Sequence, residues 1–242
     1  MPEVEEGLLE SLAALARLLE PPPDGYGRLA LLAHQVVRGC DHASVSILAD
    51  GGSVITAGVS DARTTILDDA QYEIGEGPCL SAIRGGVTVQ VDDFAGDDRF
   101  PLFAARARAE GVSACLSLPV ALGGDTVGGL NLYADRAHAY DDASIDQGGE
   151  VAEQVAALAA IVRGYERSLR LVDQVQVAMN SRAEIEQAKG ILMARSRCDA
   201  DWAFDILRRA SQRQNVKLRQ IAHTIVVNTA AGSTSMTPDD KA

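Results

Sequence analysis

The sequence of 242 residues predicts an α+β fold, in which an antiparallel sheet flanked by helices is joined by a long helix to a C-terminal three-helix bundle. Three observations predict it. Two segments, 43–60 and 112–135, alternate apolar and polar residues at the period of a strand around glycine turns. Segments with helical apolar spacing precede and separate these strands. From Ser144 to about Arg195 no residue strongly breaks a helical pattern.

The first half of the sheet domain mixes helices with a hairpin. "LLESLAALARLL" has helical spacing and stops at the prolines of 21–23, which cannot continue a helix. Gly51 and Gly52 make a tight turn between two alternating segments, which predicts a hairpin. The elements expected here are helices at about 8–19, 25–39, 61–73 and 79–84, and strands at 43–50 and 53–60.

The second half completes a sheet of about five strands. "VTVQV" at 87–91 is a short strand, followed by an acidic loop and a short helix at about 101–109. "VSACLSLPVAL" and "DTVGGLNLYAD" then form two long strands joined by a glycine turn. Helices interspersed with antiparallel strands are typical of an α+β domain.

Apolar residues along the long helix recur in steps of four and three. Such an a/d pattern over more than four heptads is typical of a coiled coil. The first two turns fit packing on the helix's own domain equally well, but beyond Tyr165 no other element is available. We therefore expect a second copy as partner, most simply in a parallel homodimer whose register Gln176 helps to fix. The predicted seam is Val162, Tyr165, Leu169, Val172, Gln176 and Met179.

The last module predicts three helices: the end of the long helix to about 196, then about 200–214 and 217–228. Asp199 is suited to the N-cap of the second helix, and Asn215 to the turn before the third. The polar tail at 229–242 is expected to be disordered. The predicted core is Ile185, Ala188, Leu192, Ala203, Ile206, Leu207, Ala210, Leu218, Ile221, Ala222 and Ile225.

The net charge of −12 hides a division along the chain. Residues 1–181 hold 12 arginines and no lysine against 27 acidic residues, whereas residues 182–226 hold 9 basic residues against 5 acidic ones. A basic module on an acidic body can contact phosphate locally while the body resists non-specific binding. Gly190, beside Lys189, costs about 1 kcal/mol relative to alanine in a mid-helix position, which calls for a reason.

Several classes of protein are disfavoured by composition. No stretch approaches about 20 uninterrupted apolar residues, and "MPEVEEGLLE" lacks the pattern of a secretory signal. The four widely spaced cysteines form no CxxC pair, which favours reduced thiols in a cytoplasmic protein. No Ser-His-Asp arrangement or phosphate-binding glycine loop is present, and the acidic pairs fall in loops. We therefore expect no catalytic residue, no metal site and no membrane partner.

"EIEQAKGILMAR" at 184–195 and "DWAFDILRRASQRQNVKLRQIA" at 201–222 carry an ordered set of residues. They resemble an ANTAR domain, the three-helix RNA-binding module of transcription antitermination regulators, although Trp202 stands where such domains often carry an acidic residue. The resemblance implies recognition of paired RNA stem-loops with six-nucleotide loops, whose unstacked bases a short basic surface can match. By residue type alone, Met193 and Phe204 would be expected in the core. The implied RNA-binding residues are Ala188, Lys189, Gly190, Met193, Arg195, Arg208, Ser211, Arg213 and Lys217.

"YEIGEGPCLSAI", "DDFAGDDRFP" and "LSLPVALGGDTVGGLNLYAD" resemble a GAF domain, a fold that holds a small molecule between sheet and helices or serves as a dimerisation unit. The ligand stays unknown, and so does any cofactor. Cys79 is followed by Leu80 where bilin-binding relatives usually have histidine, and the Asn-Lys-Phe-Asp-Glu pattern of cyclic-nucleotide-binding relatives is absent. His34, the histidine placed on a helix, is expected to be a satisfied helix residue rather than a haem ligand. The predicted ligand pocket is Tyr72, Cys79, Asp92, Asp93 and Asn131.

These resemblances predict a signal-responsive RNA-binding antitermination regulator. A signal at the GAF domain would alter the coiled coil and present two ANTAR domains to paired hairpins. Two alternatives stay open: a DNA-binding regulator that uses the helix at 217–228, and a thiol reductase that uses Cys79 and Cys115. The expected divisions are an N-terminal helix at 1–23, a GAF-like domain at 24–164, a coiled-coil linker at 165–181, an ANTAR domain at 182–228 and a tail at 229–242.

Overall fold

The computed structural model describes residues 11, 14, 17, 18 and 20–233 of the chain. Most of the helix expected at 8–19 lies outside the described residues, as does the tail beyond residue 233. The chain divides into two compact units, which are considered separately below. One lies within residues 16–167, and the other holds residues 168–233.

The first unit is built on a five-stranded antiparallel sheet with strand order β2-β1-β5-β4-β3, which confirms the predicted α+β fold. Strands β4 and β5 are joined by the predicted glycine turn, in which Gly123 and Gly124 have φ of 63° and 95°. A two-residue turn with two positive φ angles matches the twist of the strands that it connects. The strands are β1 (His42–Leu48), β2 (Val54–Val59), β3 (Val89–Val91), β4 (Ala114–Leu122) and β5 (Asp125–Ala134).

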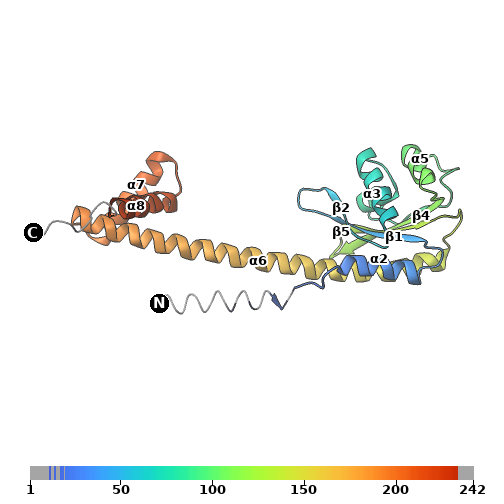
Figure 1. Cartoon of the computed structure of the whole chain (residues 1–242), viewed down its shortest axis with the longest axis horizontal. Helices are drawn as coiled ribbons and strands as arrows, with labels where there is room; N and C mark the ends of the chain where they lie inside the picture. The colour runs from blue at the N-terminus through green and yellow to red at the C-terminus, as the bar shows by residue number, and fades with distance from the viewer. Residues whose placement is uncertain (1–10, 12–13, 15–16, 19, 234–242) are drawn as a thin grey trace, which may run out of the picture. The chain divides into compact units, whose positions relative to one another are not determined.

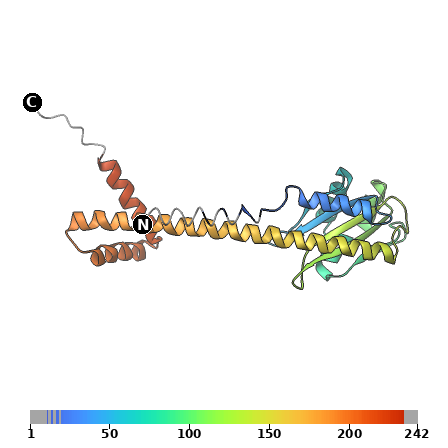
Figure 2. The same cartoon turned by 90° about the horizontal axis from the view of Figure 1, so that it is seen from below.

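Helices cover both faces of this sheet. In Figure 1, α3 and α5 lie on one side of the sheet and α2 on the other. Figure 2 shows α2 beside the start of α6 on that second side. Helix α2 ends three residues before the expected position 39, and Gly39 follows with φ of 77°. The helices are α2 (Gly25–Val36), α3 (Ala62–Ile74), α4 (Pro78–Gly85) and α5 (Pro101–Ala109), and α6 begins at Asp142.

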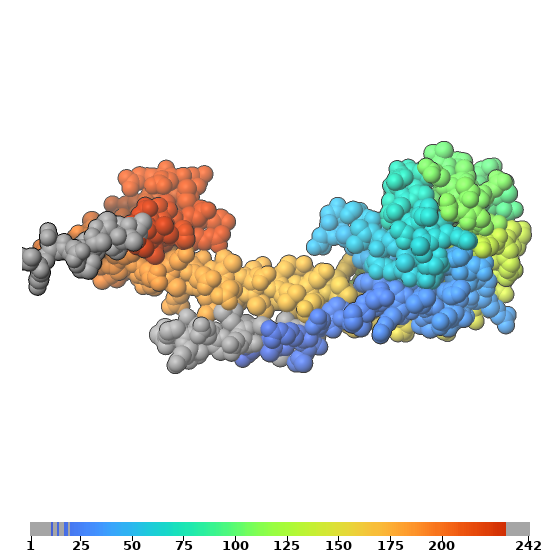
Figure 3. Space-filling model, viewed as in Figure 1, coloured from blue at the N-terminus to red at the C-terminus, as the bar shows by residue number. Residues whose placement is uncertain are grey.

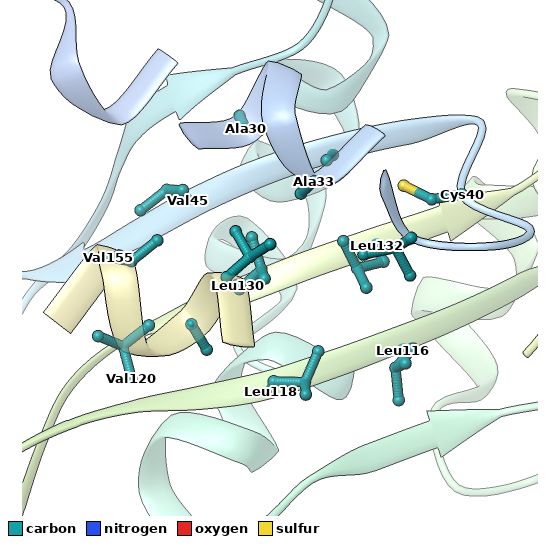
Figure 4. Close-up of a cluster of buried hydrophobic side chains, with 14 of the residues drawn as sticks. Ala30, Ala33, Cys40, Val45, Leu116, Leu118, Val120, Leu130, Leu132 and Val155 are labelled. Carbon is teal, nitrogen blue, oxygen red and sulfur yellow. The ribbon is translucent and has the colours of Figure 1, made fainter. Parts of the chain in front are cut away.

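Alternation along the strands gives the sheet two unlike faces. Because successive side chains point to opposite faces of a strand, Leu130 and Leu132 share one face of β5, whereas Asn131 and Tyr133 share the other. The leucine face forms the main apolar core under α2 and α6, as Figure 4 shows. Its buried residues include Ala30, Ala33, Val45, Leu116, Leu118, Val120, Leu130, Leu132 and Val155.

Helix α6 (Asp142–Ser196) is a single helix of 55 residues. Its first turns pack on the sheet, where Val151 and Val155 are buried. Farther along, Leu169 is 40% exposed and Gln176 is exposed, while the other predicted seam residues, Val162, Tyr165, Val172 and Met179, are partly buried. No helix among the described residues is both long enough and apolar enough to span a membrane.

The second unit ends in the predicted three-helix bundle, formed by the last part of α6, α7 (Ala200–Gln214) and α8 (Leu218–Ser233). Asp199 caps α7 by accepting a hydrogen bond of 2.8 Å from the Trp202 backbone N–H, and Asn215 ends it at φ of 53°. Both residues were expected in these roles. Helix α8 continues five residues beyond the predicted end at 228, so the start of the predicted tail is helical.

Candidate functional site

One stripe of α6 anchors the three-helix bundle. Ala188 is fully buried and packs with Leu207, Ile221 and Ala222, and the partly buried Ile185 packs against this cluster. Lys189 follows directly, and its side chain is 17% exposed. Its Nζ atom donates to both carboxylate oxygens of Glu186 at 3.0 Å. The lysine is therefore held at the edge of the bundle with its charge beside an acidic partner.

Gly190 lies on the outer side of α6. It follows Ala188 by two residues, which is about 200° around an α-helix, so it faces away from the bundle core. It is exposed, and a Cβ atom built there would meet no atom within 4 Å. The steps of four and three that include Leu169 and Gln176 continue to this position. Within the described chain Gly190 is not a packing notch, and it leaves backbone accessible to another molecule.

A hollow of about 670 Å³ lies between α6 and the start of α7. Lys189 lines it from α6, and Trp202 and Phe204 line it from α7. Trp202 is 53% exposed and Phe204 is 41% exposed, so the expectation of a core position for Phe204 is wrong. Met193 is likewise exposed rather than in the core, at 37%. Two large aromatic side chains that are exposed at one surface hollow form an apolar patch, which is more informative than a single exposed apolar residue.

The remaining cations of the bundle differ in their partners. Arg208 forms an ion pair of 2.8 Å with Asp205 on the same helix. Arg195, Arg213 and Lys217 are exposed and form no ion pair within the described part of the chain. The contacts of the structure bring Lys189 to the start of α7, but none of them joins it to these other cations.

Ser211 has a structural role in the bundle. Its hydroxyl donates a hydrogen bond of 2.6 Å to the Val216 carbonyl, and its own carbonyl accepts from the Val216 N–H. These bonds close the turn between α7 and α8 around Asn215. Ser211 was predicted as an RNA contact from its place in the ANTAR pattern, and that contact stays a prediction, made by a side chain that also holds the turn.

The polar face of the sheet carries a second group of candidate residues. Strand register places Ser44 of β1 and Ser117 of β4 opposite Asn131 of the central strand β5. Asn131 Nδ2 donates to Ser44 Oγ at 3.2 Å, and Asn131 Oδ1 accepts from Ser117 Oγ at 3.0 Å. All three residues are fully buried, so this row satisfies its own polar groups.

Asp68 of α3 is the centre of this polar cluster. It is fully buried and accepts hydrogen bonds from Tyr133 Oη at 2.7 Å and Thr56 Oγ1 at 2.9 Å. Every hydrogen-bond donor to it in the described structure is neutral. Burial raises the pKa of Asp68 to about 6, and hydrogen bonds from Ser44, Tyr133 and Thr56 oppose that rise.

Three of the five predicted pocket residues meet at one hydroxyl. Ser46 Oγ lies 2.7 Å from Tyr72 Oη and 3.0 Å from Asn131 Nδ2, and it accepts a hydrogen bond of 3.4 Å from Cys79 Sγ. The three side chains are thus linked through the Ser46 hydroxyl. Figure 3 shows the atoms of α3 and α5 covering this side of the sheet.

The two aspartates predicted for the same pocket lie elsewhere. Asp92 is exposed in the loop after β3 and accepts from Gln90 Nε2 at 2.6 Å. Asp93 accepts from the Ala95 backbone N–H at 2.8 Å, a local turn contact. The structure therefore does not bring them to Tyr72, Cys79 and Asn131. The prediction was wrong for these two residues because an acidic loop motif does not show which way its side chains point.

The thiols of the first unit are buried. Burial raises the pKa of both Cys40 and Cys79 to about 12, and it raises the pKa of Cys115 as well. Cys198, near the start of α7, is partly exposed. His34 Nδ1 lies 3.2 Å from the Cys40 carbonyl, in line with its expected role as a satisfied helix residue.

Sequence reasoning missed part of each site. Asp68, Ser46 and Tyr133 were not among the predicted pocket residues, although the serines alternate with Ala43 and Val45 along β1 and so mark a polar face. Asp68 gave no such signal, because "ILDDA" offers two adjacent acids and only the structure shows which is buried. Trp202 was noted only as a departure from a pattern.

A sheet enclosed by two helical layers, followed by a long helix and a basic three-helix bundle, defines an α+β protein of two parts. The sequence matches the GAF domain family over residues 28–158 and the ANTAR domain family over residues 173–226. The chain therefore belongs to the GAF domain family and carries an ANTAR domain after its GAF domain. This confirms the order predicted from the sequence.

Several solved structures are similar to the chain, whereas no curated protein matches it. The GAF domain of a phosphoenolpyruvate-protein phosphotransferase from Coxiella burnetii is 14% identical, with a TM-score of 0.47 over 67% of this chain and 96% of that one. The corresponding Acinetobacter domain is 11% identical, with a TM-score of 0.47 over 68% and 98%. Type II free methionine-R-sulfoxide reductase from Thermoplasma acidophilum is 15% identical, with a TM-score of 0.44 over 61% and 94%. These identities are too low to carry an activity over to this chain.

Proposed function

We propose that this protein is a cytoplasmic, dimeric antitermination regulator whose ANTAR domain binds paired RNA hairpins under the control of its GAF domain. The observation that supports this most is the edge of α6 at Lys189 and Gly190. There a lysine is held beside exposed backbone that no part of the described chain covers. Backbone access and a nearby cation suit an unpaired RNA loop, which offers bases and phosphates together.

The distribution of charge supports RNA loops over duplex DNA. Reading a duplex by a helix in the major groove needs several side chains that reach base edges. The third helix, α8, carries only Arg219 and His223 as basic residues within its bounds, and His223 is paired with Glu184 at 2.9 Å. Exposed cations near the ends of two other helices, Arg195 on α6 and Arg213 on α7, would supply the contacts to phosphate.

The GAF domain supports a sensing or dimerising role rather than thiol chemistry. Reductase activity needs a thiolate, and the thiols of Cys79 and Cys115 are fully buried with raised pKa values. Burial and the nearby Asp68 carboxyl raise the pKa of Cys79, which keeps its thiol protonated, although its hydrogen bond to Ser46 Oγ opposes the rise. A small-molecule signal would have to enter the polar cluster around Asp68 by displacing bonds that this cluster now makes to itself.

The test is a binding titration with the full-length protein and a labelled RNA of two hairpins, each with a six-nucleotide loop. Matched duplex DNA, Lys189→Ala and Arg108→Ala accompany it. Arg108 is exposed on α5 of the GAF domain, so its variant removes one positive charge that is not part of the ANTAR domain. We expect Lys189→Ala to weaken RNA binding about tenfold or more, as the loss of a charged hydrogen bond implies.

Arg108→Ala should bind RNA as the wild type does, and duplex DNA should bind weakly to all three proteins. Tighter binding to DNA than to RNA would contradict the proposal in favour of the DNA-binding alternative. Equal losses in both variants would show that the effect is one of net charge rather than of a contact at Lys189.

A further inference from the structure

The hollow between α6 and α7 has two exposed aromatic walls. The buried residues of α7 are Ala203 and Leu207, so the core of the bundle is filled without Trp202 or Phe204. Both aromatics border the hollow, and more than half of the Trp202 surface is open to solvent. The volume of about 670 Å³ lies within the range of pockets that hold small molecules.

The charges around this hollow disfavour phosphate as its occupant. Four acidic residues line it against a single cation, Lys189, which is already paired with Glu186. Carboxylates that line one hollow would repel a phosphate bound in it, so a phosphate would bind poorly there. Carboxylates do accept hydrogen bonds from the amino groups of nucleobases. The acidic residues are Glu186, Asp199, Asp201 and Asp205.

The bonds that each acidic residue already makes show which carboxylate is open to accept a hydrogen bond from a ligand. Asp199 accepts from the Trp202 backbone N–H, and Asp205 is paired with Arg208. Asp201 makes no hydrogen bond or ion pair within the described part of the chain. The residue directly before Trp202 is thus an exposed acceptor next to an aromatic face. A flat apolar surface with an adjacent acceptor suits a base that carries an amino group.

We propose that Trp202 is a stacking platform for one unpaired, amino-bearing nucleobase of the RNA loop, with Asp201 as the hydrogen-bond acceptor at the edge of the hollow. The phosphates of the same loop lie outside it, towards cations such as Arg195 and Arg213. Stacking on an aromatic ring is a common way of binding single-stranded nucleic acid. This assignment rests on the proposed function, because it takes the ligand to be RNA.

Trp202 is the single tryptophan of the chain, which makes its fluorescence a direct probe. The full-length protein is titrated with the two-hairpin RNA while tryptophan emission and the anisotropy of a label on the RNA are both recorded. Stacking predicts that emission is quenched with the same midpoint as the anisotropy change. Binding without any change in emission would overturn the assignment of Trp202 and leave RNA binding itself established.

Variants separate stacking from folding. Trp202→Ala should weaken RNA binding roughly 5- to 150-fold, the range that base stacking implies, and Trp202→Phe should recover most of the loss. Val227→Ala is the matched control, because Val227 is also a large exposed apolar residue of the same bundle, at 48%. Circular dichroism of each variant should equal that of the wild type, since the Asp199 cap uses only the backbone of Trp202.

Abasic substitution identifies the base. Each RNA lacks the base at one loop position. At the position that stacks on Trp202, loss of the base should abolish the quenching of tryptophan emission in the wild type. The same loss should not weaken RNA binding further in Trp202→Ala. If every abasic RNA weakens both proteins equally, Trp202 stacks on no base and the proposal fails. If Trp202→Ala instead breaks the dimer in sedimentation while RNA binding per subunit is unchanged, the hollow is a protein contact.

Discussion

Asp68 shows how a single buried carboxyl makes the stability of the GAF domain depend on pH. In the unfolded chain an aspartate ionises near pH 4, whereas burial raises the pKa of Asp68 in the fold to about 6. Between these values the unfolded state loses a proton that the folded state keeps. The contribution of Asp68 to stability is therefore complete below about pH 4 and falls as the pH rises through about 6.

We expect Asp68→Asn to remove this dependence. The free energy of unfolding of the variant minus that of the wild type should rise by about 3 kcal/mol between pH 4 and pH 7, because one pKa unit corresponds to about 1.4 kcal/mol. Urea denaturation followed by circular dichroism at several pH values measures the difference, in which the other carboxyl groups cancel. A pH-independent difference would mean that Asp68 titrates alike in both states.

Asn215 carries a second prediction for a single residue. Its φ of 53° lies in the left-handed region, which asparagine and glycine tolerate and alanine does not. Asn215→Ala should destabilise the bundle by about 1 kcal/mol, and Asn215→Gly should be close to neutral. Thermal unfolding followed by Trp202 fluorescence reports on this bundle alone. A glycine variant as unstable as the alanine variant would place the cost in lost side-chain contacts.

For single residues, the sequence predicted the roles that depend only on nearby positions in the chain. Asp199 and Asn215 were predicted because a cap or a turn depends on residues within a few positions. The burial of Asp68 and the exposure of Trp202 depend on which distant segments pack against them. No pattern within one segment contains that information, so both were found only in the fold.

Among the elements, α6 combines a weak helical residue with an open surface. Gly190→Ala should stabilise the helix by up to about 1 kcal/mol, because alanine is the better helix former and its Cβ would meet no atom of the chain. The same change should weaken RNA binding if backbone contact is what the glycine provides. Thermal unfolding and RNA anisotropy on one preparation should therefore move in opposite directions.

Two other results for Gly190→Ala would revise this picture. Unchanged RNA affinity would mean that RNA does not approach the helix at this point. A weaker dimer with unchanged affinity per subunit would assign the glycine to the partner helix, in keeping with its place in the a/d series. Gly164 is not a suitable control because it has interactions of its own. Ala194→Gly is the better control. It introduces the weaker helix former at an exposed position of α6, four residues beyond Gly190, so it should destabilise the helix.

Elements were predicted more accurately in the middle than at their ends. The period-two strands and the glycine turns were placed within a residue or two, since alternation and positive φ are local signals. Helix α8 was ended five residues early, because "TAAGS" suggests a polar tail although alanine favours continuation of the helix. Helix α2 was predicted to end three residues too late, because "VVRG" continues the apolar spacing although valine and glycine disfavour a helix.

For the whole molecule, the predicted dimer links RNA affinity to the seam of α6. Leu169 is on the a/d series and 40% exposed, and Leu171 is off it and 54% exposed. Leu169→Asp should give a monomer in sedimentation equilibrium, whereas Leu171→Asp should stay dimeric. The monomer should bind a two-hairpin RNA no more tightly than a one-hairpin RNA, because the gain from linked sites is lost.

The pair of leucines makes this prediction strict. Both substitutions add the same charge to the same helix, so a general effect of charge would affect them equally. A wild-type protein that is monomeric at the concentrations of RNA binding would contradict the dimer directly. The charge pattern of the sequence suggested two functional parts, and the a/d pattern suggested a second copy, but the structure of one chain does not test that association.

The uneven burial of the four cysteines allows the ANTAR domain to be labelled selectively. Cys40, Cys79 and Cys115 are buried within the GAF domain, and Cys198 is partly exposed. A maleimide nitroxide should thus attach at Cys198 first, since reagents need access to the sulfur. A labelled dimer would carry one spin on each ANTAR domain, and pulsed electron resonance would report the distance between the two spins before and after RNA is added.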